Sequence, residues 1–163
     1  MAQDPPEPLP VDPDIDVAAP AQARELTRAP AVVLSAIALG GAIGALARYG
    51  LQLAFPNGPA GFPWATFAIN VVGCLLIGVV AVLALRVWPH RPLVRPFFGV
   101  GILGGFTTFS TYAVDASRLF DERAFGAAAA YLGGTLLAAL VAAYTGIALA
   151  EWLVARLAPG NPR

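Results

Sequence analysis

Lysine is absent from this sequence, and cysteine and histidine each occur only once in its 163 residues. Because Cys74 is the only cysteine, no disulfide can form within the chain. His90 has no other histidine, cysteine or carboxylate near it in sequence, which argues against a histidine-based metal site. The sequence also has neither a phosphate-binding loop nor a nucleophile with a base, so we expect no enzymatic activity.

Charged residues are scarce as well. They make up 12% of the chain, against 58% hydrophobic residues, and the mean hydropathy is +0.69. Four apolar runs are long enough to cross a bilayer, which takes about 20 residues in an α-helix. They comprise residues 30–55, 63–85, 96–114 and 124–150. We therefore predict an all-α membrane protein with one four-helix transmembrane domain over residues 31–157, surrounded by the lipid bilayer and without a nucleic-acid partner.

The two ends of the chain differ from the apolar runs. Residues 1–30 contain seven prolines and six acidic residues, a composition typical of disordered segments. We predict a disordered, acidic, proline-rich tail over residues 1–30 and a short C-terminal tail over residues 158–163.

The arginines are unevenly distributed about the four predicted spans. Seven flank the side that carries both termini and two flank the opposite side, with Arg48 left unassigned. The seven are Arg24, Arg28, Arg86, Arg91, Arg95, Arg156 and Arg163, and the two are Arg118 and Arg123. By the positive-inside rule, this imbalance favours a multi-pass membrane protein with both termini in the cytoplasm.

Polar residues within the second apolar run share one helical face. Thr66, Asn70 and Gly73 follow each other at spacings of four and three. The amide of Asn70 must find a partner at membrane depth, because an unpaired amide there costs several kcal/mol. Two interpretations stay open: a structural hydrogen bond to a neighbouring helix, or a contact with a ligand.

The third run contains the stretch GGFTTFST, residues 104–111, which is poorly suited to a continuous helix. We predict that the third helix is broken near its middle. Backbone carbonyls freed by such a break can bind a cation. After it, Phe109 and Tyr112 lie three residues apart and share a face, either for packing or for ligand binding.

The apolar runs also contain spaced glycines and one arginine. Gly40 and Gly44 in the first run, like Gly101 and Gly105 in the third, are spaced for close helix packing. Arg48 lies late in the first run, where it serves either as an interfacial anchor or to attract anions. We expect no buried carboxylate in the interiors of the first three spans, which argues against a proton-coupled exporter of organic cations.

Three of these motifs resemble the CrcB/Fluc family of fluoride channels, in the family's order. GGAIGALARY (residues 40–49) matches the family's GGxxGAxxRY pattern. ATFAINVVGCLLIG (residues 65–78) resembles its GTFxxNxxGxFxxG pattern, and GILGGFTTFSTY (residues 101–112) resembles GxxGGxTTFSTF. The last motif departs from the family only at Tyr112, where a second phenylalanine is usual. The resemblance covers roughly residues 31–157.

The resemblance implies an antiparallel dimer with two fluoride pores and a central, structural sodium ion. The backbone carbonyls of Gly104 and Thr107 would bind the sodium ion. Fluoride would meet the Asn70 amide, the ring edges of Phe109 and Tyr112, and hydroxyl groups; the side chains assigned to the pore are Asn70, Phe109, Tyr112, Ser110, Thr111 and Thr66. Arg48 and Asp115 would lie toward the vestibules.

The resemblance therefore predicts a passive, fluoride-selective channel of the inner (plasma) membrane that lowers cytoplasmic fluoride. Two alternatives are a small dual-topology multidrug-type transporter, which normally needs a membrane-embedded glutamate, and a non-conducting membrane assembly subunit. The second subunit is either another copy of this chain or a paired homologue, and the arginine imbalance favours the homologue because it argues for one fixed orientation.

Overall fold

The computed structural model describes residues 30–58 and 60–157. The tails predicted for residues 1–30 and 158–163 therefore lie outside the described residues, apart from Pro30, which begins the first helix. Within the described part of the chain the regular structure is entirely helical. Four helical spans are long and apolar enough to cross a membrane, which confirms the predicted all-α class and the number of spans.

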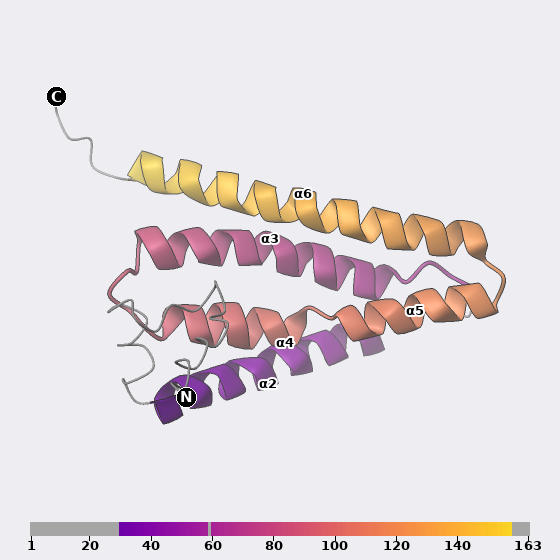
Figure 1. Cartoon of the computed structure of the whole chain (residues 1–163), viewed down its shortest axis with the longest axis horizontal. Coiled ribbons are helices and arrows are strands. Elements are labelled where there is room, and N and C mark those ends of the chain that lie inside the picture. Colours follow the sequence, from indigo (N-terminus) through magenta and orange to yellow (C-terminus); the bar gives the residue numbers. More distant parts are fainter. Residues whose placement is uncertain (1–29, 59, 158–163) are drawn as a thin grey trace, which may run out of the picture.

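The spans follow one another along the chain with short connections (Figure 1). They are α2 (Pro30–Ala54), α3 (Trp64–Arg86), a third span of several segments, and α6 (Phe125–Leu157). The third span consists of the π-helical segment η1 (Arg95–Leu103), the single turn α4 (Gly104–Phe106) and α5 (Phe109–Asp121). It extends seven residues beyond the predicted apolar run, because its last part is amphipathic rather than uniformly apolar.

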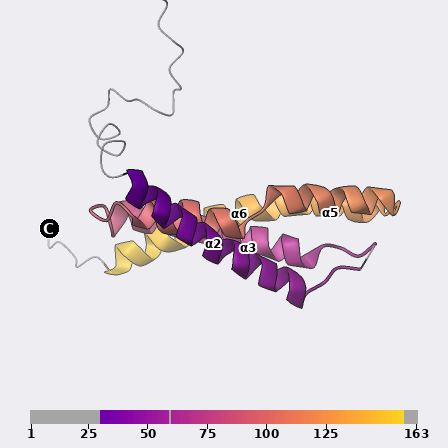
Figure 2. The same cartoon turned by 90° about the horizontal axis from the view of Figure 1, so that it is seen from below.

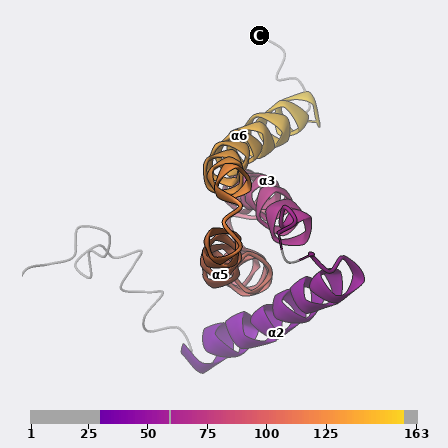
Figure 3. The ribbon, with the colours of Figure 1, turned by 90° about the vertical axis from the view of Figure 1, so that its right-hand side faces the viewer.

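The helices form a curved row rather than a closed bundle, as the end-on view shows (Figure 3). The helix α3 packs on α6, and α2 packs on η1 and α4, so that the third span lies between α2 and α3. Seen from below, α2 crosses the other helices obliquely (Figure 2). Among the described residues, α2 and α6 do not contact each other. Both outer helices therefore keep an open face.

Large apolar side chains cover these open faces. Leu46 on α2 and Leu137 on α6 are 70% and 66% exposed, and Phe109 on α5 is 79% exposed. Such surface is unfavourable in water, whereas in a bilayer lipid tails or another helix cover it without that penalty. The pattern of exposure thus agrees with a membrane protein.

Glycines hold α2 against the third span. A Cβ atom added at Gly44 would collide with the backbone of Ile102 and Phe106, and one added at Gly101 would collide with the backbone of Ile37 and Gly40. The two helices approach this closely only because these positions lack side chains. The close packing predicted from the glycine spacing is therefore confirmed for this pair.

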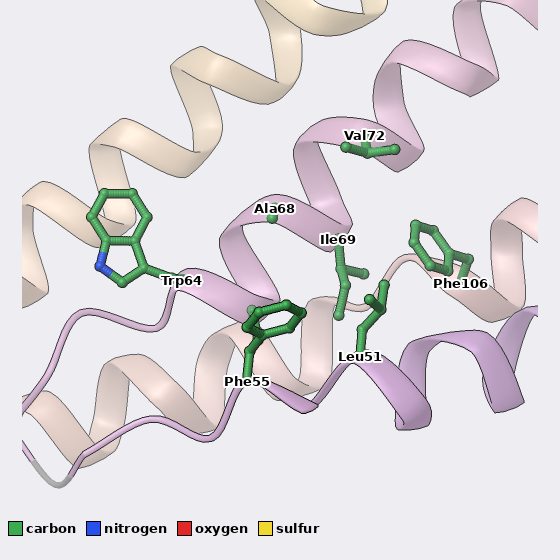
Figure 4. A pocket seen from close by; sticks show the side chains of 8 residues that line it. Leu51, Phe55, Trp64, Ala68, Ile69, Val72 and Phe106 are labelled. Atoms are coloured by element: carbon green, nitrogen blue, oxygen red, sulfur yellow. The ribbon is translucent and has the colours of Figure 1, made fainter. Parts of the chain in front are cut away.

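An apolar cavity of about 390 Å³ lies between the end of α2 and the beginning of α3 (Figure 4). Its lining consists of Leu51, Phe55, Trp64, Ala65, Ala68, Ile69, Val72 and Phe106. None of these side chains except the Trp64 indole carries a hydrogen-bond donor. The cavity therefore offers little to a small hydrated anion, and the polar site lies elsewhere.

Candidate functional site

The helical hydrogen-bond pattern of the third span is interrupted at Thr107 and Thr108. Both residues are extended, with ψ values of 154° and 125°, and α5 starts at Phe109. Thr108 caps α5, because its side-chain oxygen accepts a hydrogen bond from the Thr111 N–H at 3.1 Å. The Thr107 hydroxyl donates to the Leu103 carbonyl at 2.8 Å. Two β-branched residues with these side-chain bonds favour an extended turn over a continuing helix.

Asn70 on α3 is hydrogen-bonded to the backbone at this interruption. Its Oδ1 accepts from the Thr108 N–H at 2.9 Å, and its Nδ2 donates to the Thr108 carbonyl at 3.0 Å. The structural hydrogen bond to a neighbouring helix, one of the two interpretations of Asn70, is therefore present. A side-chain amide has two N–H groups, so these two bonds leave one of them uncommitted.

The interruption removes the helical donors of two carbonyl groups. In a continuous helix the Thr108 N–H would donate to the Gly104 carbonyl, but here it donates to Asn70. The Thr111 N–H would likewise donate to the Thr107 carbonyl, but it donates to the Thr108 side chain. The carbonyls of Gly104 and Thr107 thus lose their usual partners. These are the two carbonyls that the family resemblance assigns to a cation.

Arg48 contacts the same region from α2. Its Nε donates to the Gly105 carbonyl at 3.1 Å. In a continuous helix that carbonyl would accept from the Phe109 N–H, so the arginine replaces a bond that the interruption removes. A positive charge there also complements the dipole of the helical run formed by η1 and α4, which ends at Phe106. Arg48 therefore supports the backbone at the interruption.

The aromatic pair lies on α5 directly after the interruption. The ring centroids of Phe109 and Tyr112 are 5.7 Å apart, and Tyr112 also packs on Tyr131 of α6 at 5.1 Å. The Tyr112 hydroxyl donates to the Leu132 carbonyl at 2.9 Å. The hydroxyl group that distinguishes Tyr112 from phenylalanine is therefore hydrogen-bonded to the backbone of α6.

The hydroxyl groups near this pair are linked to one another. The Thr108 hydroxyl donates to the Thr111 hydroxyl at 3.1 Å and lies 3.3 Å from the Ser110 hydroxyl. Ser110, like Phe109, is exposed. The structure thus brings Asn70, Phe109, Ser110 and Thr111 to one region around the interruption.

Asp115 lies deeper in the protein than its position after the apolar run indicates. It is 8% exposed, and its Oδ2 accepts a hydrogen bond from the Thr66 hydroxyl at 2.7 Å. Tyr131 also donates to Oδ2, at 3.5 Å. The expectation of no buried carboxylate in the first three spans is therefore wrong, because the third span continues to Asp121 and Tyr131 of α6 contacts Asp115. The Thr66 hydroxyl hydrogen is committed to this carboxylate.

Three residues of this region were not identified from the sequence: Thr108, Arg118 and Tyr131. Arg118 is three residues after Asp115, and its Nη2 lies 3.7 Å from Asp115 Oδ1. That spacing is the one signal in the sequence that could have revealed the pair. Tyr131 carries no such signal, because its contact with Asp115 depends on how α6 packs on α5. Among the described residues no group of three or more His, Cys, Asp or Glu side chains could hold a metal ion.

The family model described as "CrcB-like protein, Camphor Resistance (CrcB)" matches residues 35–147, which include the interruption and most of all four spans. The chain belongs to the CrcB-like family. This membership confirms the resemblance drawn from the three sequence motifs, and the CrcB-like motifs account for most of the residues that meet at the interruption.

Curated relatives of this CrcB-like chain carry the name fluoride-specific ion channel. FluC 2 of Streptomyces avermitilis is 54% identical over 125 residues, which cover 77% of this chain and 79% of the relative. FluC 1 of Streptomyces coelicolor is 50% identical over 143 residues, covering 88% and 89%. FluC of Rhodospirillum centenum is 43% identical over 125 residues, covering 76% and 98%. The aligned portions span most of each protein.

Proposed function

We propose that this chain is a subunit of a passive fluoride channel in the inner (plasma) membrane, which lets fluoride leave the cytoplasm. The observation that carries the proposal is the extensive identity with relatives named fluoride-specific ion channels. The four apolar spans and the polar region inside them support a membrane channel rather than an enzyme.

The groups around the interruption suit fluoride physically. A pore for a small, strongly hydrated anion must replace water with hydrogen-bond donors and exclude larger halides. The uncommitted N–H of Asn70, the hydroxyls of Ser110 and Thr111, and the ring edges of Phe109 and Tyr112 are such groups. None of these five carries a fixed positive charge that would trap the anion.

The direction of transport needs no energy coupling. Hydrogen fluoride is neutral and crosses lipid unaided, and it ionises in the cytoplasm. A negative-inside membrane potential then drives the trapped fluoride anion outward through any selective pore. Both termini face the cytoplasm in this proposal, as the arginine imbalance favours.

A second subunit in antiparallel orientation completes the channel. Support comes from the open faces of the curved row and from Phe109, which is 79% exposed beside the polar region. The partner is another copy of this chain or a homologue; the arginine imbalance favours a homologue, and Streptomyces avermitilis has relatives named FluC 2 and FluC 3. If the chain expressed alone places its termini on both sides of the membrane and conducts fluoride, the homologue is not needed.

A sodium ion at the interruption is part of the proposal. The carbonyls of Gly104 and Thr107 have lost their helical donors, and carbonyl oxygens are suitable ligands for a hard cation. Two carbonyls from each of two antiparallel subunits would supply four oxygens. The ion would stabilise the dimer rather than take part in conduction.

The buried Asp115 gives little support to the alternative function, a multidrug-type transporter. Such a transporter needs a carboxylate that is free to bind a cationic substrate or a proton. Here the carboxylate accepts hydrogen bonds from Thr66 and Tyr131 and faces Arg118. It is therefore already paired within the subunit.

Fluoride efflux from liposomes tests the proposed function. Purified protein is reconstituted, the vesicles are loaded with fluoride, and release is followed with a fluoride electrode. We expect release well above that of protein-free vesicles. Asn70→Asp should abolish it, because a carboxylate would replace the amide donor and repel the anion. An absence of release from wild-type vesicles, with the folded protein present, would refute the proposal.

A further inference from the structure

The buried Asp115 forms an ion pair with Arg118, which is partly buried. Two ion pairs occur within residues 30–58 and 60–157, and the other, Arg86 with Glu151, has side chains that are 64% and 53% exposed. The side chain of Asp115 is only 11% exposed and that of Arg118 34%. A carboxylate at such a position is unfavourable unless a cation or several donors compensate it.

Each oxygen of Asp115 has a different partner. The Oδ2 atom accepts from the hydroxyls of Thr66 and Tyr131, which are neutral donors. The Oδ1 atom faces Nη2 of Arg118, the one cationic group within 4 Å of the carboxylate in the described part of the chain. Arg118 is therefore the counter-charge of Asp115.

Arg118 contributes a positive charge to this pair but no hydrogen bond. The distance of 3.7 Å is too long for a hydrogen bond. The Nε and Nη2 atoms of Arg118 are buried and have no hydrogen-bond partner among the described residues. A guanidinium group whose buried nitrogen atoms make no hydrogen bond acts on the neighbouring carboxylate mainly through its electrostatic field.

The pair lies close to the proposed fluoride path. Asp115 and Arg118 follow Tyr112 on α5 by three and six residues, a rise of about 4.5 and 9 Å along the helix. Tyr131 connects Tyr112 with Asp115: its ring packs on that of Tyr112 at a centroid distance of 5.1 Å, and its hydroxyl donates to Asp115. Only one ring therefore separates the carboxylate from the aromatic pair. An uncompensated negative charge there would repel an anion.

We infer that Arg118 neutralises Asp115 so that fluoride can pass this end of the pore. Arg118 is therefore a positioning residue, because it acts on fluoride through Asp115. This inference rests on the proposed channel function. Removal of its charge should lower the rate of fluoride efflux on the order of tenfold at low fluoride. The loss should shrink as the fluoride load rises, because repulsion lowers the local anion concentration without blocking the pore.

The test compares four variants with the wild type in the liposome assay. Arg118→Gln removes the charge, Arg118→Lys keeps it, and Arg118→Gln combined with Asp115→Asn removes both charges. Arg123→Asn is the matched control, because Arg123 lies in the following turn on the same side of the membrane and is exposed. Its φ of 56° is one that asparagine tolerates better than most residues.

We expect slow efflux from Arg118→Gln at low fluoride, and rates within about threefold of wild type for Arg118→Lys and Arg123→Asn. The double variant should release fluoride faster than Arg118→Gln, because it lacks the uncompensated carboxylate. The fraction of vesicles that empty at long times should be equal in all of them, whereas a purely structural role would lower that fraction at every fluoride concentration. If the double variant is as slow as Arg118→Gln, or if Arg118→Gln matches the wild type, the inference is overturned.

The wild-type result separates this inference from the proposed function. Absence of efflux from the wild type would overturn the proposed function and this inference together, while normal wild-type efflux with an unaffected Arg118→Gln overturns the inference alone. If Arg118→Gln does not fold, the double variant decides by itself. It carries neither charge of the pair, so loss of its conduction would overturn the role assigned to Arg118.

Discussion

Replacement of Asn70 by alanine tests how the interruption of the third span is held. Asn70 makes two hydrogen bonds to the backbone of Thr108, of 2.9 and 3.0 Å. In Asn70→Ala both the N–H and the carbonyl of Thr108 lose these partners. The interruption provides neither group with a helical partner in exchange, because Thr108 is extended.

The expected cost follows from the number of groups left unpaired. An unsatisfied polar group in a buried position costs about 1–3 kcal/mol, so two such groups cost about 2–6 kcal/mol. Water that enters from the open face would move the value toward the lower end of this range. We therefore expect Asn70→Ala to lower the free energy of unfolding by at least about 2 kcal/mol.

Thermal unfolding of the purified protein in detergent, followed by circular dichroism, measures this effect. The matched control is Thr145→Ala on α6, which also deletes a side-chain hydrogen bond to a backbone carbonyl, that of Val141 at 2.7 Å. Thr145 is exposed and its bond lies within one helix, so we expect a change of less than about 1 kcal/mol. Equal effects of the two substitutions would refute the claim that Asn70 holds the interruption.

The remaining predictions concern the aromatic pair, the helix contact and the cation. Tyr112→Phe should retain fluoride efflux within about threefold and lose about 1 kcal/mol of stability, because the hydroxyl donates to Leu132 rather than to the pore; loss of efflux would show that the anion needs this hydroxyl. Gly44→Ala should prevent folding, since its Cβ would collide with the third span, whereas Gly41→Ala, with nothing within 4 Å, should be harmless; equal yields of folded protein would contradict the close packing. Replacement of sodium by a large organic cation should lower the thermal midpoint by a few degrees, in proportion to lost binding energy; an unchanged midpoint would argue against the cation.

Much of the fold follows from composition, because a bilayer allows few alternatives. Helices must span about 30 Å of hydrocarbon, so four apolar runs separated by loops predict four spans with little ambiguity. The structure differs from this prediction at the end of the third span, where the sequence is less apolar. The third span continues through Asp115 and Arg118 to Asp121, where the apolar run no longer marks its end. Hydrogen bonds from Thr66 on α3 and Tyr131 on α6 satisfy Asp115 within this extension.

Local features of the site are also visible in the sequence, whereas its long-range contacts are not. The face shared by Thr66 and Asn70 follows from helical periodicity, and both residues contact the third span. Which residue each one meets depends on the crossing angle and register of the helices. The bonds of Arg48 to Gly105 and of Tyr112 to Leu132 could not be predicted for the same reason.

The ratio of fluoride to chloride efflux tests the central claim most directly. The same reconstituted protein is loaded with either anion, and release is compared with that from protein-free vesicles. Because the proposed path offers neutral donors in a narrow space, we predict rapid fluoride release and chloride release no faster than from protein-free vesicles. Equal rates for the two anions, or no fluoride release from folded protein, would contradict the assignment of this chain as a fluoride channel.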